Sequence, residues 1–350
     1  MKLLCHLIAM TLLPFWAFAS ETSFWKDTKE KSAFNGMIWR SEFEDPESSA
    51  IAAKVENLIS AFEESTGKQL VPGIHRRVAL KIYSNSGAGL HTPKPVVDAV
   101  QDVLKKRGYD AEDIIIVDAR EEMLREAGYL PPLSEIEKTG PYYRGARIYS
   151  LNTGVQKSPT WFYESPLPME FSSPLGREML KPIITVDPEE ARKSYLPESL
   201  VTKVDFWINL PMASHNPATG LSGALVNGTL FNVTNGTRFF SSPANASVAV
   251  AEIAAIPELN ESWALNLISL EEFQYIGGPA YNANYTRSKG ELWLSVDPVI
   301  MDANLIRLQN QARLESGFME LPEIPDFLVY AMQLGLGRGL SMETKFQDLP

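Results

Sequence analysis

The sequence predicts an α/β fold, with a mainly parallel sheet flanked by helices, an N-terminal arm and a long insertion. Three observations support this prediction. A strand, a loop, a helix and a second strand follow one another over residues 78–117, which is the order of a β-α-β unit. Further segments with the length and regular pattern of strands follow at 183–186 and 204–210. Hydrophobic residues make up 45% of the 350, so the chain can bury a large core.

The N-terminal segment contains an arm and one helix. Residues 20–47 are polar with scattered aromatic side chains, so we expect them to lie on the surface of the core. Residues 48–66 carry apolar side chains at helical spacing, and Gly67 is suited to end that helix. We therefore expect residues 20–75 to form an arm and a helix outside the main domain.

The β-α-β unit comes next. Residues 78–83 form an apolar strand, and Thr92 can cap a helix that has Pro93 at its first position. Gly108 is suited to end this helix. The wholly apolar run 114–117 is typical of a parallel strand that is buried on both faces.

The C-terminal half predicts more strands and helices after an interruption. Segment 120–182 is rich in Pro, Tyr and Ser, so we expect a long insertion or lid there. The strands expected after it are 183–186, 204–210, 263–269 and 292–296, and the helices expected are those that begin near 221, 248, 297 and 325. We expect one α/β domain at 76–320, followed by a C-terminal helix and tail at 321–350.

The first nineteen residues resemble an export signal. Lys2 precedes an apolar run at 3–18, which ends in Ala17-Phe18-Ala19, an A-x-A cleavage pattern. We expect cleavage after Ala19 and a secreted or periplasmic protein, with no membrane span after cleavage; an uncleaved N-terminal anchor is the alternative. Cleavage would remove Cys5, the one cysteine of the chain, so we expect no thiolate site and no iron–sulfur cluster.

The charge of the chain excludes one class of partner. The formal net charge is −11 and there is no basic tract, so we expect no nucleic-acid binding. Asn-x-Ser/Thr sequons begin at Asn227, Asn232, Asn235, Asn245, Asn260 and Asn284. We attribute them to a composition rich in Asn, Gly, Ser and Thr, although in a eukaryotic secretory protein they would be glycan acceptors.

The loop between the first strand and its helix contains Gly87 and Gly89, as phosphate-binding loops do. Thr92 stands where a dinucleotide-binding loop has its third glycine, and no Gly-Lys-Ser/Thr follows, so a Walker loop is excluded. A cradle for an anion and a plain tight turn remain open.

Two histidines follow predicted strands. His91 and His215 lie on loops that leave the carboxyl end of a strand, which is where ligands bind in open α/β sheets. Each is as easily a capping or core residue as a functional one. Asp297, before Pro298, is suited to cap a helix, whereas Asp302 points away from it around an ideal helix.

Three segments in order resemble a known family. Their residues are a strand with Lys81 followed by Thr92-Pro93; Asn209-Leu210-Pro211, Ser214-His215, Thr219-Gly220 and Asn227; and Gly278-Pro279 followed by Asp297-Pro298 and Asp302. Over roughly residues 77–313 this resembles the family called domain of unknown function 362. Ser214 and Val226 stand where the family has lysines, and the ferredoxin module of some relatives is missing.

Several of these residues lie in or just after predicted strands, which predicts a site at the carboxyl edge of the sheet. Catalytic roles would fall to His215, Lys81 and Asp297, and substrate-binding roles to His91, Asn209, Asn227 and Asp302. We expect Lys81 and both histidines to share one cavity near Asp297, where His215 exchanges a proton and Lys81 holds an anionic group. A metal and a cofactor are left undetermined. Two functions remain open: an exported enzyme acting on a small polar or anionic molecule, and a non-catalytic protein that binds a ligand or partner at a decayed site.

Overall fold

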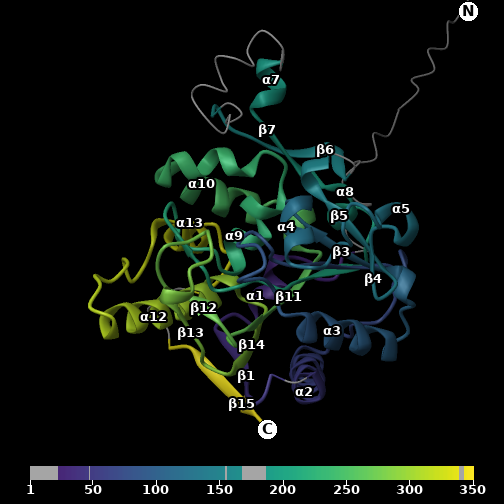
Figure 1. Cartoon of the computed structure of the whole chain (residues 1–350), viewed down its shortest axis with the longest axis horizontal. Helices are drawn as coiled ribbons and strands as arrows, with labels where there is room; N and C mark the ends of the chain where they lie inside the picture. The colour runs from purple at the N-terminus through teal and green to yellow at the C-terminus, as the bar shows by residue number, and fades with distance from the viewer. Residues whose placement is uncertain (1–22, 47, 154–155, 168–186, 339–342) are drawn as a thin grey trace, which may run out of the picture.

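The computed structural model describes residues 23–46, 48–153, 156–167, 187–338 and 343–350 (Figure 1). The predicted signal peptide at 1–19 and the strand expected at 183–186 lie outside these residues. Within the described ranges, no helix combines the length and apolar character needed to cross a lipid bilayer.

A sheet of nine strands forms the centre of the molecule, in the order β15-β1-β14-β11-β8-β2-β3-β5-β4. The five strands from β11 to β5 are parallel to one another, so the predicted α/β class with a mainly parallel sheet is confirmed. The bounds of the strands in this sheet, in chain order, are β1 Met37–Glu42, β2 Val78–Lys81, β3 Ile114–Asp118, β4 Tyr142–Tyr143, β5 Ala146–Ser150, β8 Phe206–Asn209, β11 Trp263–Ser269, β14 Glu291–Ser295 and β15 Lys345–Leu349.

The predicted β-α-β unit is present as β2, α3 (Lys94–Lys106) and β3. The expected cap is wrong, however, because the helix begins at Lys94 with Pro93 in the N-cap position. The Thr92 hydroxyl instead accepts a hydrogen bond from the Tyr83 N–H and donates one to the Leu210 carbonyl. Thr92 therefore ties the loop after β2 to the segment after β8.

Helices cover both faces of the sheet (Figure 1). Because side chains alternate along a strand, Leu80 packs toward one face and Ala79 toward the other. The first face is covered by α2 (Ser48–Thr66) and α3, and the second by α9, α10 and α13. Within the described ranges, the bounds of the α-helices other than α2 and α3 are α1 Thr28–Ser32, α4 Glu121–Glu126, α5 Ile136–Thr139, α7 Pro188–Ala191, α8 Glu198–Val201, α9 Ala224–Gly228, α10 Pro243–Ala254, α11 Pro257–Asn260, α12 Pro298–Glu315 and α13 Asp326–Gln333.

Both ends of the described chain contribute strands to the sheet. The predicted N-terminal arm contains β1, which pairs antiparallel with β14. The predicted C-terminal tail contains β15, which pairs parallel with β1 and forms one edge of the sheet. The arm is therefore a part of the sheet and does more than lie on the core.

The predicted insertion belongs only in part outside the sheet. Within it, β5 pairs parallel with β3 and β4 pairs antiparallel with β5, so this portion extends the sheet, contrary to the expectation. The portion that leaves the sheet includes an antiparallel ribbon of β6 (Lys157–Glu164) and β7 (Lys193–Pro197), which lies at the top of Figure 1 near α7. Short antiparallel pairs also join β9 (His215–Asn216) to β10 (Gly220–Leu221) and β12 (Phe273–Gln274) to β13 (Thr286–Arg287).

Candidate functional site

A row of buried polar side chains crosses the sheet at the carboxyl ends of its parallel strands. It starts with Lys81 at the end of β2 and Asp118 at the end of β3, both with no exposed surface. The Lys81 Nζ lies 2.6 Å from Asp118 Oδ1, and it also donates to the Ile82 carbonyl at 2.6 Å and to Asn227 Oδ1 at 3.0 Å. These three acceptors use all three N–H groups of the ammonium.

The row continues through amides toward β14. Asn227 on α9 donates through Nδ2 to Asn209 Oδ1 at 2.8 Å, and Asn209, at the end of β8, donates to Asn266 Oδ1 at 2.9 Å. Asn266 on β11 donates in turn to the Ser295 carbonyl at 3.1 Å. The side chains of this polar row, which we define as Asp118, Lys81, Asn227, Asn209 and Asn266, are completely buried.

The polar row has no free group to offer a ligand at its cationic end. The Asp118 carboxylate also accepts hydrogen bonds from the Ser84 hydroxyl and from the Ala119 N–H, the latter at 2.7 Å. Burial lowers the pKa of Lys81, and the charge of Asp118 opposes that shift. Since every proton of Lys81 is already bound and no solvent reaches it, the predicted role of Lys81 as the holder of a substrate anion does not fit this geometry.

Asp297 is likewise engaged in structure. Its Oδ1 caps α12 by accepting hydrogen bonds from the Val299 and Ile300 N–H groups, as the sequence predicts. Its Oδ2 accepts from the N–H groups of Gly36 and Arg338, each at 3.0 Å. One buried carboxylate thus joins the N-terminal segment, α12 and the C-terminal segment. Because both of its oxygens are engaged in these hydrogen bonds, the catalytic role expected for Asp297 does not fit the structure.

Asp302 has a role that the sequence did not suggest. From the second turn of α12 it accepts hydrogen bonds from the Ala224 N–H at 2.5 Å and the Leu225 N–H at 2.9 Å, at the start of α9. Burial raises the pKa of Asp302 to about 7, against the effect of these hydrogen bonds. Asp302 therefore holds α9, and with it Asn227 of the polar row, and it is not placed to bind a substrate.

The two histidines line different cavities. His91 lines a small cavity of about 150 Å³, whereas His215 lines another of about 250 Å³ beside Leu321 and Pro325. Burial lowers the pKa of His215 to about 4, with a smaller contribution from the Arg313 cation, so its imidazole is neutral at pH 7.

Segment 277–282 explains why the histidines do not meet. A Cβ atom at Gly278 would overlap the His215 carbonyl oxygen, and one at Gly89 would overlap the Tyr281 ring. The segment therefore packs against both histidine-bearing loops, and the expectation of one cavity shared by Lys81, His91 and His215 is wrong. The Ser86 hydroxyl also donates to the Pro279 carbonyl, which holds the segment down.

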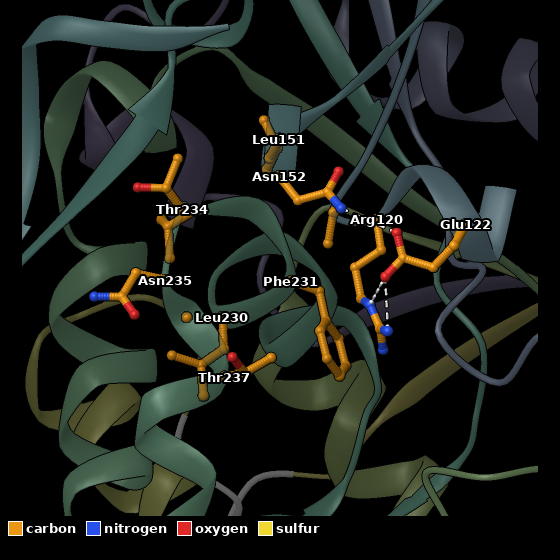
Figure 2. A pocket seen from close by; sticks show the side chains of 12 residues that line it. Arg120, Glu122, Leu151, Asn152, Leu230, Phe231, Thr234, Asn235 and Thr237 are labelled. Atoms are coloured by element: carbon orange, nitrogen blue, oxygen red, sulfur yellow. Dashed lines mark hydrogen bonds and ion pairs between the residues drawn. The ribbon is translucent and has the colours of Figure 1, made fainter. Parts of the chain in front are cut away.

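A larger cavity, of about 760 Å³, opens at the carboxyl ends of β3 and β5; we call it the edge cavity. Figure 2 shows Arg120 and Glu122 on one side of it and Thr234, Asn235 and Thr237 on the other. Leu151, Leu230, Phe231 and Val233 supply apolar surface between them. Its volume lies within the range of about 300–1,000 Å³ that is typical of small-molecule sites.

Arg120 is the cation of the edge cavity. Its Nε and one terminal nitrogen lie 2.7 Å from Glu122 Oε1, and the other Glu122 oxygen accepts from Asn152 Nδ2 at 3.0 Å. The Arg120 side chain is 43% exposed. Because a guanidinium has five N–H groups, Arg120 keeps donors free for an anion while Glu122 fixes its position.

Sequence reasoning missed the residues of the edge cavity. Arg120 comes two residues after the end of β3, a position that the edge rule for parallel sheets does single out. Phe231 and Asn235 lie in the sequon-rich stretch that we attributed to composition. Asn227, Asn232 and Asn260 are buried in the folded protein, so three of the six sequons cannot be surface glycan acceptors.

The described residues offer no evident metal centre. No group of three or more His, Cys, Asp or Glu side chains in this part of the chain is arranged to hold a metal ion.

Comparisons with known proteins do not assign a family. No protein-family model matches the chain, and no curated protein matches it. A crystal structure of a Thermotoga maritima protein, a target of the Northeast Structural Genomics Consortium, is similar at 12% sequence identity and a TM-score of 0.41. The match covers 79% of this chain and 60% of that protein, and a likeness this distant says nothing about function. The resemblance to domain of unknown function 362 stays a prediction.

Proposed function

We propose that the protein binds a small organic anion with an apolar body in the edge cavity, and that it acts as a binding protein without covalent chemistry. The observation that carries this proposal is the position and lining of the cavity. It lies outside the carboxyl ends of two parallel strands and combines apolar surface with one exposed guanidinium.

The choice of binding over catalysis rests on the residues that would perform chemistry. Lys81, Asp297 and Asp302 are buried, and the hydrogen bonds of each are made within the fold. A general acid or base must reach the proton that it transfers, and none of the three reaches the edge cavity. His215 lines a different cavity.

The chemistry of the lining defines the ligand. Leu230 and Phe231 line the cavity, and although they are only 1% and 3% exposed, the surface they present to a hydrocarbon group is apolar. The Phe231 ring is fixed by an edge contact with Tyr83 and a tilted contact with Phe240, at centroid distances of 5.8 and 5.3 Å. Arg120 would pair with a carboxylate, since a guanidinium matches that group in shape and charge. A small aromatic or branched carboxylate satisfies both parts.

Titration calorimetry with three probes of matched shape tests the proposal. Phenylacetate should bind more tightly than 2-phenylethanol, and 2-phenylethylamine should bind least. Arg120→Met should weaken phenylacetate binding about tenfold or more, because a hydrogen bond to a charged group is lost.

Arg307→Met is the matched control. Arg307 is 46% exposed and paired with a glutamate, Glu323, but it lies on α12 and does not line the edge cavity. Its replacement should leave phenylacetate binding unchanged. Equal binding of all three probes, or equal loss in both variants, would contradict the proposal.

We also propose that the protein is exported, on the strength of the Ala17-Phe18-Ala19 pattern. N-terminal sequencing of material recovered outside the cytoplasm should then begin at Ser20. A secreted form that retains residues 1–19 would contradict cleavage.

A further inference from the structure

We propose that the small cavity beside His91 is a second ligand site, which binds a primary alkylammonium group. It is separate from the edge cavity and independent of the function proposed there. We call it the His91 cavity; it is lined by Gly89, Leu90, His91, Pro93, Met212, Glu271 and Glu272 and measures about 150 Å³.

The topology of the sheet places this cavity where ligands bind. His91 follows β2, Met212 follows β8, and Glu271 and Glu272 follow β11. These three strands are adjacent and parallel, so the loops after them leave the same edge. The loops after three neighbouring strands thus line one crevice outside the carboxyl ends of those strands.

His91 contributes a hydrogen-bond acceptor. Its Nδ1 lies 2.9 Å from the Thr92 carbonyl oxygen, and because a carbonyl only accepts, Nδ1 carries the proton. In the neutral ring Nε2 then holds a lone pair. Burial lowers the pKa of His91 below its usual value, and the Lys94 cation adds to this effect, while the hydrogen bond with Thr92 and the Glu272 charge oppose it, so the neutral ring predominates at pH 7.

The two glutamates contribute negative charge that the fold leaves uncompensated. The Glu271 carboxylate has no hydrogen-bond or ion-pair partner among the described residues, and Glu272 accepts only from the Tyr281 hydroxyl there, at 3.2 Å. No ion pair joins Lys94 to either glutamate in the described part of the chain, and the Lys94 ammonium lies 6.0 Å from the centroid of the Tyr129 ring. Burial and the neighbouring Glu272 charge raise the pKa of Glu271, as expected of a carboxyl group with no cation beside it.

A primary ammonium group matches this set of acceptors. It has three N–H donors and one positive charge, and the residues that line the cavity include two glutamates and a histidine whose Nε2 holds a lone pair. Leu90 and Met212, which are almost completely buried, supply an apolar floor for the methylene groups of the ligand. The volume equals that of about five waters at ~30 Å³ each, so a short alkyl chain is the size that fits.

n-Butylammonium is the probe for this site, and titration calorimetry together with the NMR signals of the His91 ring are the measurements. We expect saturable binding with a dissociation constant below ~10 mM and a shift of the His91 ring signals. Glu271→Gln should weaken the binding about tenfold or more through loss of a charged hydrogen bond.

Glu258→Gln is the matched control. Glu258 is also half-buried and has an oxygen without a partner among the described residues. It lies on α11, which precedes β11, and therefore at the amino ends of the parallel strands, away from the His91 cavity. That variant should bind n-butylammonium like the natural protein.

Four outcomes would overturn the proposal. They are binding that leaves the His91 signals unmoved, equal affinity for n-butanol, unchanged affinity in Glu271→Gln, and displacement of the probe by an equal concentration of calcium, which would indicate a metal site. Failure here leaves phenylacetate binding at the edge cavity untouched, and the reverse also holds, because the two sites share no lining residue.

Discussion

Replacing Lys81 by methionine separates a structural role for this lysine from the substrate-binding role that the sequence suggests. Methionine retains much of the length of the side chain but carries no charge. The Asp118 carboxylate then stays buried and keeps only the Ser84 hydroxyl and the Ala119 N–H as partners. We expect the variant to lose much of its stability, since an unpaired charge in the core is costly.

The magnitude follows from the burial of the pair. Both side chains have no exposed surface and their charged atoms lie 2.6 Å apart, so the cost of removing one partner is about 3–5 kcal/mol. The hydrogen bonds that Asp118 keeps place Lys81→Met near 3 kcal/mol, at the lower end of that range. A domain of ordinary stability, about 5–15 kcal/mol, would lose a large fraction of its free energy of unfolding.

Urea unfolding at pH 7, followed by tryptophan fluorescence and circular dichroism, measures this effect. Asp118→Asn should cost a similar amount, and the double variant Lys81→Met/Asp118→Asn should cost less than the sum by about 2 kcal/mol or more, because the charge is then removed from both sides. Lys203→Met is the control, since its ion pair with Glu198 at 2.9 Å is exposed and worth at most ~1 kcal/mol. Two results would show that Lys81 and Asp118 do not form a stabilising buried ion pair. One is a loss of unfolding free energy in Lys81→Met no larger than in this control, and the other is a double variant whose loss equals the sum of the two single losses.

Two further predictions concern other buried contacts. Burial lowers the pKa of Lys31 from 10.5 to about 7. Between these two pH values the unfolded chain binds more protons than the folded one, so the free energy of unfolding should rise with pH. Urea unfolding across this range should show a smaller rise in Lys31→Met, and identical pH profiles of the unfolding free energy would refute the prediction. Gly278→Ala should destabilise the protein by ~1–3 kcal/mol, because the added methyl group overlaps the His215 carbonyl. Gly335→Ala is the control, since its methyl group meets no neighbour and strains only the backbone, and it should cost less. If thermal unfolding shows a smaller loss of stability in Gly278→Ala than in Gly335→Ala, segment 277–282 does not pack as described.

The fold could be predicted wherever its information is local. The unit from Val78 to Asp118 shows itself through apolar runs and a helix start within about forty residues, and helix α2 matches its expected bounds. Strands β1 and β15 were missed because their partners lie far away in the chain. Met37 pairs with Lys345, and nothing in the sequence near either residue reveals the other.

The site could be predicted only as far as the edge of the sheet. The rule that ligands bind at the carboxyl ends of parallel strands led to His91 and His215, and both lie there. It could not show that segment 277–282 separates them. Lys81 lay within the strand expected at 78–83 and Asp118 directly follows the apolar run 114–117, but their ion pair depends on which strands are neighbours, and that is a property of the whole sheet.

The polar row has a direction. From Lys81 through Asn227, Asn209 and Asn266, every amide turns its oxygen toward the ammonium and its NH₂ group away from it. Rotating a single amide by half a turn would set two NH₂ groups against each other at one link and two oxygens at the next, so the orientation is shared by all three or by none. The aligned amide dipoles also extend the influence of one positive charge across three strands, and a residue exchanged at Asn266 would change the electrostatic environment of Lys81 without touching it.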